Sequence, residues 1–179
     1  ELLNKLTSPL DAGMKRIGDF VPDAMYNIGS NEKGLRSGFY ELDDTIRGLC
    51  KGNLIIVAGR PSMGKSTFAA NIAANVARDG NVVAYFSLEM TSIEIAQRML
   101  FGLSRRSEQE IVNDLKRGGS DAAQDVMRVS ESISDFKFFL NENTNLTVSK
   151  IEMECRKIAA LEGKLDLAVI DYLGLVQSE

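Results

Sequence analysis

A short glycine-rich stretch directly after an apolar run sets the strongest limit on the fold of this chain. It reads Gly59, Arg60, Pro61, Ser62, Met63, Gly64, Lys65 and Ser66. This spacing of two glycines, a lysine and a hydroxyl residue is the pattern of a phosphate-binding loop between a strand and a helix. Average residue frequencies would produce it by chance in roughly one chain in a hundred of this length. We therefore expect a nucleoside triphosphate site.

Each position of the loop has a physical task. Gly59 and Gly64 allow backbone angles that other residues resist and let the chain approach a ligand closely. The N–H groups of the loop and of the helix start attract an anion. Lys65 is expected to reach the β- and γ-phosphates of ATP, and the Ser66 hydroxyl is expected to bind Mg²⁺.

A magnesium site of this kind needs an acid on a neighbouring strand. Asp171 follows an apolar run, residues 167–170, and so falls at the carboxyl edge of the sheet, where open α/β folds bind ligands. We assign it to the metal; the alternative is a strand-end acid without function. Asp166 is a poorer candidate because it precedes the same strand.

Hydrolysis also needs a group that orients or deprotonates water. Glu89 lies just past the apolar run 82–86 and should reach the same edge, where a carboxylate could hold a water in line with the γ-phosphate. The alternative is an acid favoured at a helix start by the helix dipole. Arg98 either assists this site or forms a surface ion pair.

The order of apolar and helical patterns predicts an α/β fold. Apolar runs separated by helical patterns indicate a mainly parallel sheet covered by helices on both faces. The expected strands are 54–58, 82–86, 136–140 and 165–170, and the expected helices are 66–78, 92–101, 107–117, 121–133 and 148–161.

Composition excludes several classes of function. The 179 residues contain no histidine, which excludes histidine-ligated zinc and catalysis by Ser-His or Cys-His pairs within this chain. The net charge of −4 gives an overall field that repels nucleic acid. No apolar run approaches the roughly 20 residues of a membrane-spanning helix. The two cysteines are expected to be reduced thiols in a cytoplasmic protein.

The first 30 residues differ from the remainder. Large apolar residues alternate there with proline and glycine breaks, which indicates a connector carrying one or two short helices. We interpret residues 1–30 as a linker that docks on a partner or a neighbouring subunit; a solvated linker is the alternative. Residues 31–179 are expected to form the ATPase core.

Five stretches in order resemble the DnaB-type hexameric replicative helicases. They are Gly34–Asp43, Gly48–Leu54, Ala58–Lys65, Phe86–Met90 and Asp171–Leu173. Relatives often have threonine at the Ser66 position, aspartates at the Asn141-Glu142 pair and glutamine at the Gly174 position, so we assign no function to the last two. Serine keeps the hydroxyl that metal binding needs.

The resemblance implies a RecA-like P-loop NTPase that hydrolyses ATP with magnesium and moves 5′ to 3′ on single-stranded DNA as a hexameric ring. It implies that Glu89 is the catalytic carboxylate, and that Lys65, Ser66 and Asp171 bind ATP and Mg²⁺. Implied partners are DNA, contacted mostly outside this chain, other copies of the chain, primase and a helicase loader, in the cytoplasm of a bacterial or phage-infected cell.

Two alternatives stay open at this stage: a RecA-fold ATPase of another kind, such as a recombinase, and a module that only binds nucleotide or partner. The family's sensor residue, DNA-contacting loops and arginine finger are expected beyond Glu179, with further strands of the sheet. Loss of an arginine finger can cost about 10³–10⁵ in rate, so this stretch alone is expected to hydrolyse ATP weakly.

Overall fold

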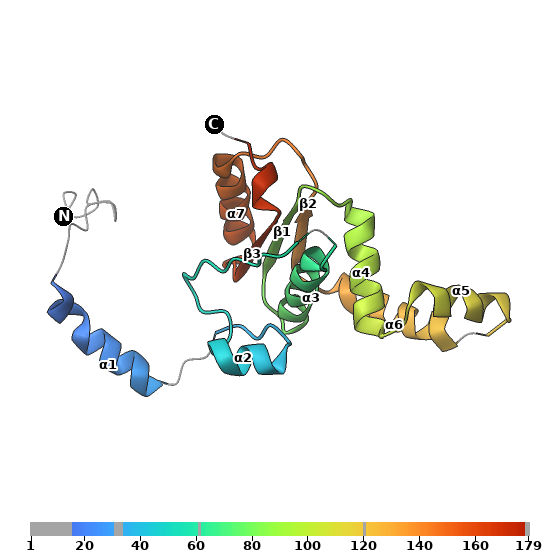
Figure 1. Ribbon diagram of the computed structural model, residues 1–179, viewed down its shortest axis with the longest axis horizontal. Helices are drawn as coiled ribbons and strands as arrows, with labels where there is room; N and C mark the ends of the chain where they lie inside the picture. Colours follow the sequence, from blue (N-terminus) through green and yellow to red (C-terminus); the bar gives the residue numbers. More distant parts are fainter. Residues whose placement is uncertain (1–15, 31–33, 61, 120, 178–179) are drawn as a thin grey trace. The chain divides into compact units, whose positions relative to one another are not determined.

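The computed structural model describes residues 16–30, 34–60, 62–119 and 121–177 (Figure 1). The chain forms two compact units, Glu1–Lys33 and Gly34–Glu179. The larger unit is an α/β domain, as the alternation of apolar runs and helical patterns predicts.

The centre of the larger unit is a parallel sheet in the order β2-β1-β3. Its strands are β1 (Val83–Ser87), β2 (Phe138–Asn141) and β3 (Leu167–Asp171). Every residue of β1 is buried, because this strand has a neighbour on each edge and helices on each face. The parallel sheet and three of the expected strands are confirmed, with bounds that differ by one or two residues.

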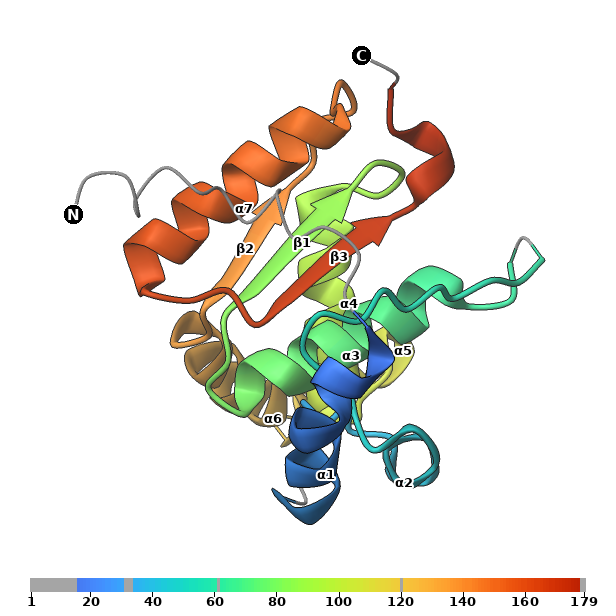
Figure 2. The same ribbon diagram turned by 90° about the vertical axis from the view of Figure 1, so that its left-hand side faces the viewer.

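Helices cover both faces of this sheet (Figure 2). On one face, α3 (Lys65–Arg78) and α4 (Ser92–Ser104) pack against Val83 and Tyr85 of β1. On the other face, α7 (Val148–Glu162) packs against Ala84 and Phe86. Alternate residues of a strand point to opposite faces, so the continuous apolar run of β1 supplies both cores.

The expected strand at 54–58 is wrong. Residues 53–60 have no strand pairing among the described residues, and Leu54 and Ile56 are 87% and 76% exposed. An apolar run becomes a strand only where its backbone N–H and C=O groups meet a partner strand. β3 is the outer strand of the sheet here, and Ile170 on it is 36% exposed.

The segment before this run contains a helix that the sequence patterns did not indicate. α2 (Tyr40–Ile46) follows a turn in which the Asp43 carboxylate accepts hydrogen bonds from the N–H groups of Ser37 and Gly38 at 2.8 and 3.2 Å. Asn75 of α3 donates to the Ser37 carbonyl at 2.9 Å. These bonds attach the segment that contains α2 to α3 and so hold that segment beside the sheet.

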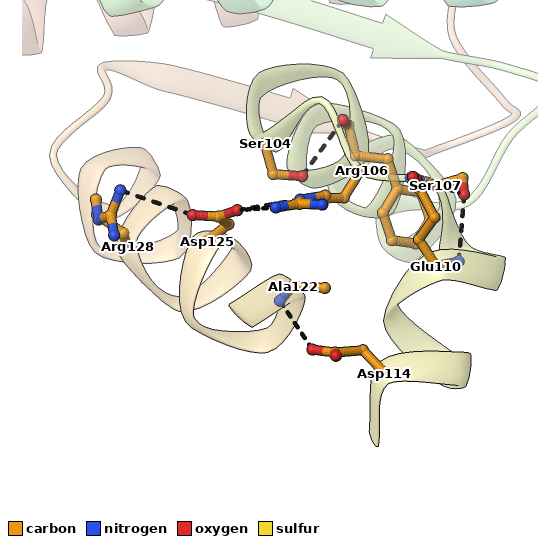
Figure 3. Close-up of polar contacts among 9 residues, drawn as sticks. Ser104, Arg106, Ser107, Glu110, Asp114, Ala122, Asp125 and Arg128 are labelled. Atoms are coloured by element: carbon orange, nitrogen blue, oxygen red, sulfur yellow. Dashed lines mark hydrogen bonds and ion pairs between the residues drawn. The ribbon is translucent and has the colours of Figure 1, made fainter. Parts of the chain in front are cut away.

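Three consecutive helices extend the domain between β1 and β2. They are α4, α5 (Glu108–Lys116) and α6 (Asp121–Ser134), and all the helices expected from the patterns after residue 60 are confirmed. Figure 3 shows the contacts that α6 makes with the preceding segments: Arg106, in the turn between α4 and α5, pairs with Asp125 of α6 at 2.7 Å, and Asp114 of α5 accepts from the Ala122 N–H of α6 at 2.9 Å. A partly exposed ion pair contributes little to stability, so the effect of these two contacts is mainly to orient α6 against α5 and the turn that precedes it.

The smaller unit carries a 3₁₀ helix, η3 (Ile17–Phe20), followed by α1 (Val21–Ser30). The expected short helix in this connector is confirmed, and Gly29 and Ser30 are its last residues. The apolar set before residue 16 lies outside the described residues. In the part of the chain that the structure describes, no helix has the length and hydropathy to cross a membrane.

The packing of α3 on β1 gives a direct test of the fold. Ala73 is fully buried at this contact, so Ala73→Leu should destabilise the chain by about 1–3 kcal/mol through overpacking. Urea unfolding measures the difference. Ala96→Leu, at an exposed position of α4, is the matched control and should change stability little; equal effects of the two variants would contradict this packing.

Candidate nucleotide-binding site

The glycine-rich loop turns sharply into the first turn of α3. Ser62 and Gly64 both have positive φ, 63° and 84°, and the Phe68 N–H donates to the Gly64 carbonyl at 2.8 Å. Positive φ at alternate residues of a loop turns backbone N–H groups toward one concavity. Among the residues that the structure describes, no side chain caps the start of α3, and free N–H groups at a helix start attract anions.

The loop folds back over the side chain of Lys65. A Cβ placed on Gly59 would lie 3.5 Å from Lys65 Cγ and 3.8 Å from Met63 Cβ, which shows how closely the two ends of the loop approach. Lys65 Nζ lies 5.2 Å from the centre of the Tyr172 ring, within the range of a cation–π contact. The lysine therefore reaches the residue that directly follows β3.

Asp171 ends β3 beside this lysine contact. Its carboxylate is buried, with 6% of the residue exposed, and Oδ2 accepts a hydrogen bond from the Tyr85 hydroxyl at 3.1 Å. Burial, and then the negative charge of Asp171, raise the pKa of Tyr85 far above its usual range. The hydroxyl therefore keeps its proton and acts as the donor in this pair.

Glu89 lies in the turn after β1 and is exposed. Two contacts hold this turn: Ser87 Oγ accepts from the Met90 N–H at 3.1 Å and donates to the Met90 carbonyl at 2.6 Å. The Leu88 N–H donates to the Asp171 carbonyl at 2.8 Å. The structure therefore places Glu89 at the same edge of the sheet as Asp171, as the topology predicts.

The start of α4, just beyond Glu89, is held by hydrogen bonds from the residue that directly follows β2. Thr91 and Glu94 form a capping box, and Glu142 accepts hydrogen bonds from the N–H and Oγ of Ser92, both at 2.6 Å. These bonds lower the pKa of Glu142. Sequence reasoning assigned this acid no function; its place directly after β2, at the same edge as Glu89, was the available signal.

Arg98 lies on α4 and donates to Thr67 Oγ1 on α3. Its positive charge also opposes the rise in the Tyr85 pKa. Of the two interpretations open from sequence, the structure favours a place beside the site, since Thr67 follows Ser66 directly.

The remaining residues expected in the loop are Arg60, Pro61 and Met63. Pro61 lies outside the described residues. Arg60 and Met63 are exposed, and the Met63 N–H donates to the Arg60 carbonyl at 3.3 Å.

A parallel sheet, a glycine-rich loop that enters a helix, and an acid at the end of a neighbouring strand together define a P-loop nucleotide-binding domain. Comparison with known proteins narrows this class. The family described as DnaB-like helicase C terminal domain matches residues 34–179, and the chain belongs to that family. Nucleotide use and the helicase function are properties of the family.

Named relatives agree with this assignment. The probable replicative DNA helicase of Trieres chinensis is 37% identical over 150 residues, which are 81% of this chain and 32% of that protein. Replicative DNA helicase DnaB of Geobacillus stearothermophilus is 36% identical over 159 residues, 87% of this chain and 34% of that protein. The chain thus spans about a third of the length of these relatives.

Solved structures show the same fold. One, described as an ATPase domain, is 26% identical with a TM-score of 0.80, covering 92% of this chain and 60% of that one. A DnaB-like replicative helicase, described with its interactions with primase, is 26% identical with a TM-score of 0.83, covering 99% of this chain and 43% of that one. These likenesses confirm the RecA-like fold.

Proposed function

We propose that this chain is the ATP-hydrolysing motor part of a replicative DNA helicase. The observation that carries the proposal is the convergence of the glycine-rich loop and the end of β3, joined by Lys65 Nζ over the Tyr172 ring. This contact joins the lysine expected to bind phosphate to the residue that follows the acid expected to bind metal. The family match supports the same reaction.

In this proposal, ATP phosphates lie in the concavity of the loop, residues 59–64, at the start of α3. Lys65 binds the β- and γ-phosphates in place of its present contact with the Tyr172 ring. The backbone N–H groups of the loop and the positive end of the helix hold the remaining phosphate charge.

The residues present fit magnesium. Ser66 supplies a hydroxyl and Asp171 a buried carboxylate, and Mg²⁺ prefers oxygen ligands with several places filled by water and phosphate. No three His, Cys, Asp or Glu side chains converge within the ranges that the structure describes.

Glu89 is the proposed catalytic carboxylate. It stands exposed in the turn after β1, and that turn is fixed by Ser87 and by the Leu88 N–H bond to β3. A carboxylate held at this edge can orient an attacking water toward the γ-phosphate and accept its proton.

The proposal extends to the assembled protein. The family resemblance implies that the assembled protein is a hexameric ring that moves 5′ to 3′ on single-stranded DNA. It also implies binding of primase and a helicase loader, and action in the cytoplasm of a bacterial or phage-infected cell. The net charge of −4 supports placing most DNA contacts outside this chain. The family match argues against a recombinase-type ATPase; that this stretch by itself hydrolyses ATP only weakly stays part of the proposal.

Removal of the lysine tests nucleotide binding. In the intact protein, Lys65→Ala should weaken ATP binding at least about tenfold, because a hydrogen bond to a charged group contributes about 1.5–3 kcal/mol. Equilibrium binding of a fluorescent ATP analogue measures the change. Lys116→Ala, at the exposed end of α5, is the matched control; unchanged affinity in Lys65→Ala would reject the phosphate-loop assignment.

A second variant separates turnover from binding. Glu89→Gln keeps the shape of the side chain but removes its basicity, so ATP turnover should fall by about 10²–10⁴-fold while affinity is retained. Steady-state phosphate release and the same binding assay measure both. Glu108→Gln, exposed on α5, should leave both unchanged, and normal turnover in Glu89→Gln would move the catalytic role elsewhere.

The first unit is proposed to dock on a neighbouring copy of this chain. Ile17, Met25 and Tyr26 are 83%, 69% and 73% exposed in η3 and α1, a density of large apolar side chains that marks an interaction surface. In the intact helicase, Met25→Ser with Tyr26→Ser should reduce the fraction of hexamer in analytical ultracentrifugation. Met127→Ser, 65% exposed on α6, is the control; an unchanged hexamer fraction would favour a solvated linker.

A further inference from the structure

We propose that Tyr85 is a positioning residue for the magnesium site, whose buried hydroxyl fixes the orientation of the Asp171 carboxylate. This inference rests on the proposed function of Asp171. It is carried by a hydrogen bond between the Tyr85 hydroxyl and Asp171 Oδ2 at 3.1 Å, between two strands that are far apart in sequence.

The register of the sheet brings these side chains together. Tyr85 pairs directly with Val169 of β3, and Asp171 lies two residues further along the same strand. Residues two apart on a strand share a face, so Tyr85 and Asp171 are diagonal neighbours on the face that α3 covers. Such diagonal pairs are within reach of a long aromatic side chain.

The ring of Tyr85 has little freedom to move. It is fully buried between α3 and the sheet, and its centroid lies 5.9 Å from that of Phe138 at an interplanar angle of 21°. A tyrosine locked in this way holds its hydroxyl at a fixed point. Because phenylalanine would fill nearly the same apolar space, the packing alone does not require the hydroxyl.

The bond engages one carboxylate oxygen, Oδ2. We infer that it turns the other oxygen, Oδ1, toward the open edge of the sheet, where Lys65 and Ser66 begin α3. Partners that orient a metal-binding carboxylate in this way commonly change metal affinity by about 10–100-fold when they are removed. Arg98 is the other charged group that affects the pKa of Tyr85. Arg98 donates a hydrogen bond to Thr67, and the test below changes neither of these two residues.

The test is Tyr85→Phe in the intact protein, read by nucleotide binding as a function of Mg²⁺ concentration. The magnesium concentration that gives half-maximal binding should rise at least about tenfold, while binding of nucleotide in EDTA stays unchanged. Tyr40→Phe, 88% exposed on α2, is the matched control. Equal magnesium dependence in Tyr85→Phe and wild type would overturn the proposal.

A double-mutant cycle distinguishes positioning from general stability. In an Asp171→Asn background, Tyr85→Phe should have no further effect on magnesium dependence, since the carboxylate it orients is gone. An equal effect in both backgrounds would show that Tyr85 acts only through the fold. If wild-type protein bound no nucleotide, or bound it without regard to magnesium, the proposed function itself would fail instead.

A measurement on the unaltered chain keeps the proposal testable should the variant fold poorly. NMR should detect the Tyr85 hydroxyl proton in slow exchange with water, because the group is buried and hydrogen-bonded, and its resonance should shift when nucleotide and Mg²⁺ bind together but not when nucleotide binds in EDTA. A proton in fast exchange, or one insensitive to the metal, would overturn the assignment.

Discussion

The parallel pairing of β1 with β3 sets the positions of the residues at the edge of the sheet that carries the candidate site. It runs over five residue pairs, from Val83 with Leu167 to Ser87 with Asp171, and continues in the Leu88 N–H bond to the Asp171 carbonyl. Since parallel strands end at one edge, this register places the turn that carries Glu89 beside the acid. A slip of one residue would turn Asp171 to the opposite face.

The groups assigned to chemistry stand where regular structure ends, and polar bonds from neighbouring elements hold them there. Ser87 fixes the turn of Glu89, Glu142 holds the start of α4, and Tyr85 binds the carboxylate of Asp171. The buried strands and helices provide a rigid base, while Glu89 stands in an exposed turn. This division is common in α/β folds, where a rigid scaffold positions binding and catalytic groups on loops.

Much of the domain could be predicted from local patterns, and the exceptions have a shared cause. The helices after residue 60 have clear periodicity, and some also have side-chain caps, such as the Ser107–Glu110 box before α5, so they were predictable. The run 54–58 has the composition of a strand, but composition does not supply a pairing partner. α2 depends on the contacts of Asp43 with the preceding turn. A periodic pattern of apolar residues does not indicate such contacts.

The amino-acid sequence is enough to predict the local chemistry: the glycine-rich loop and its lysine, the acids after two apolar runs, and the helical and strand periods that lead to an α/β fold. Which of these groups meet depends on the three-dimensional fold. Lys65 beside Tyr172, Tyr85 on Asp171, Arg98 on Thr67 and Glu142 on Ser92 each join segments well separated in the chain. Sheet register and helix packing produce these contacts. Both depend on pairing between residues far apart in the sequence, which local spacing does not predict.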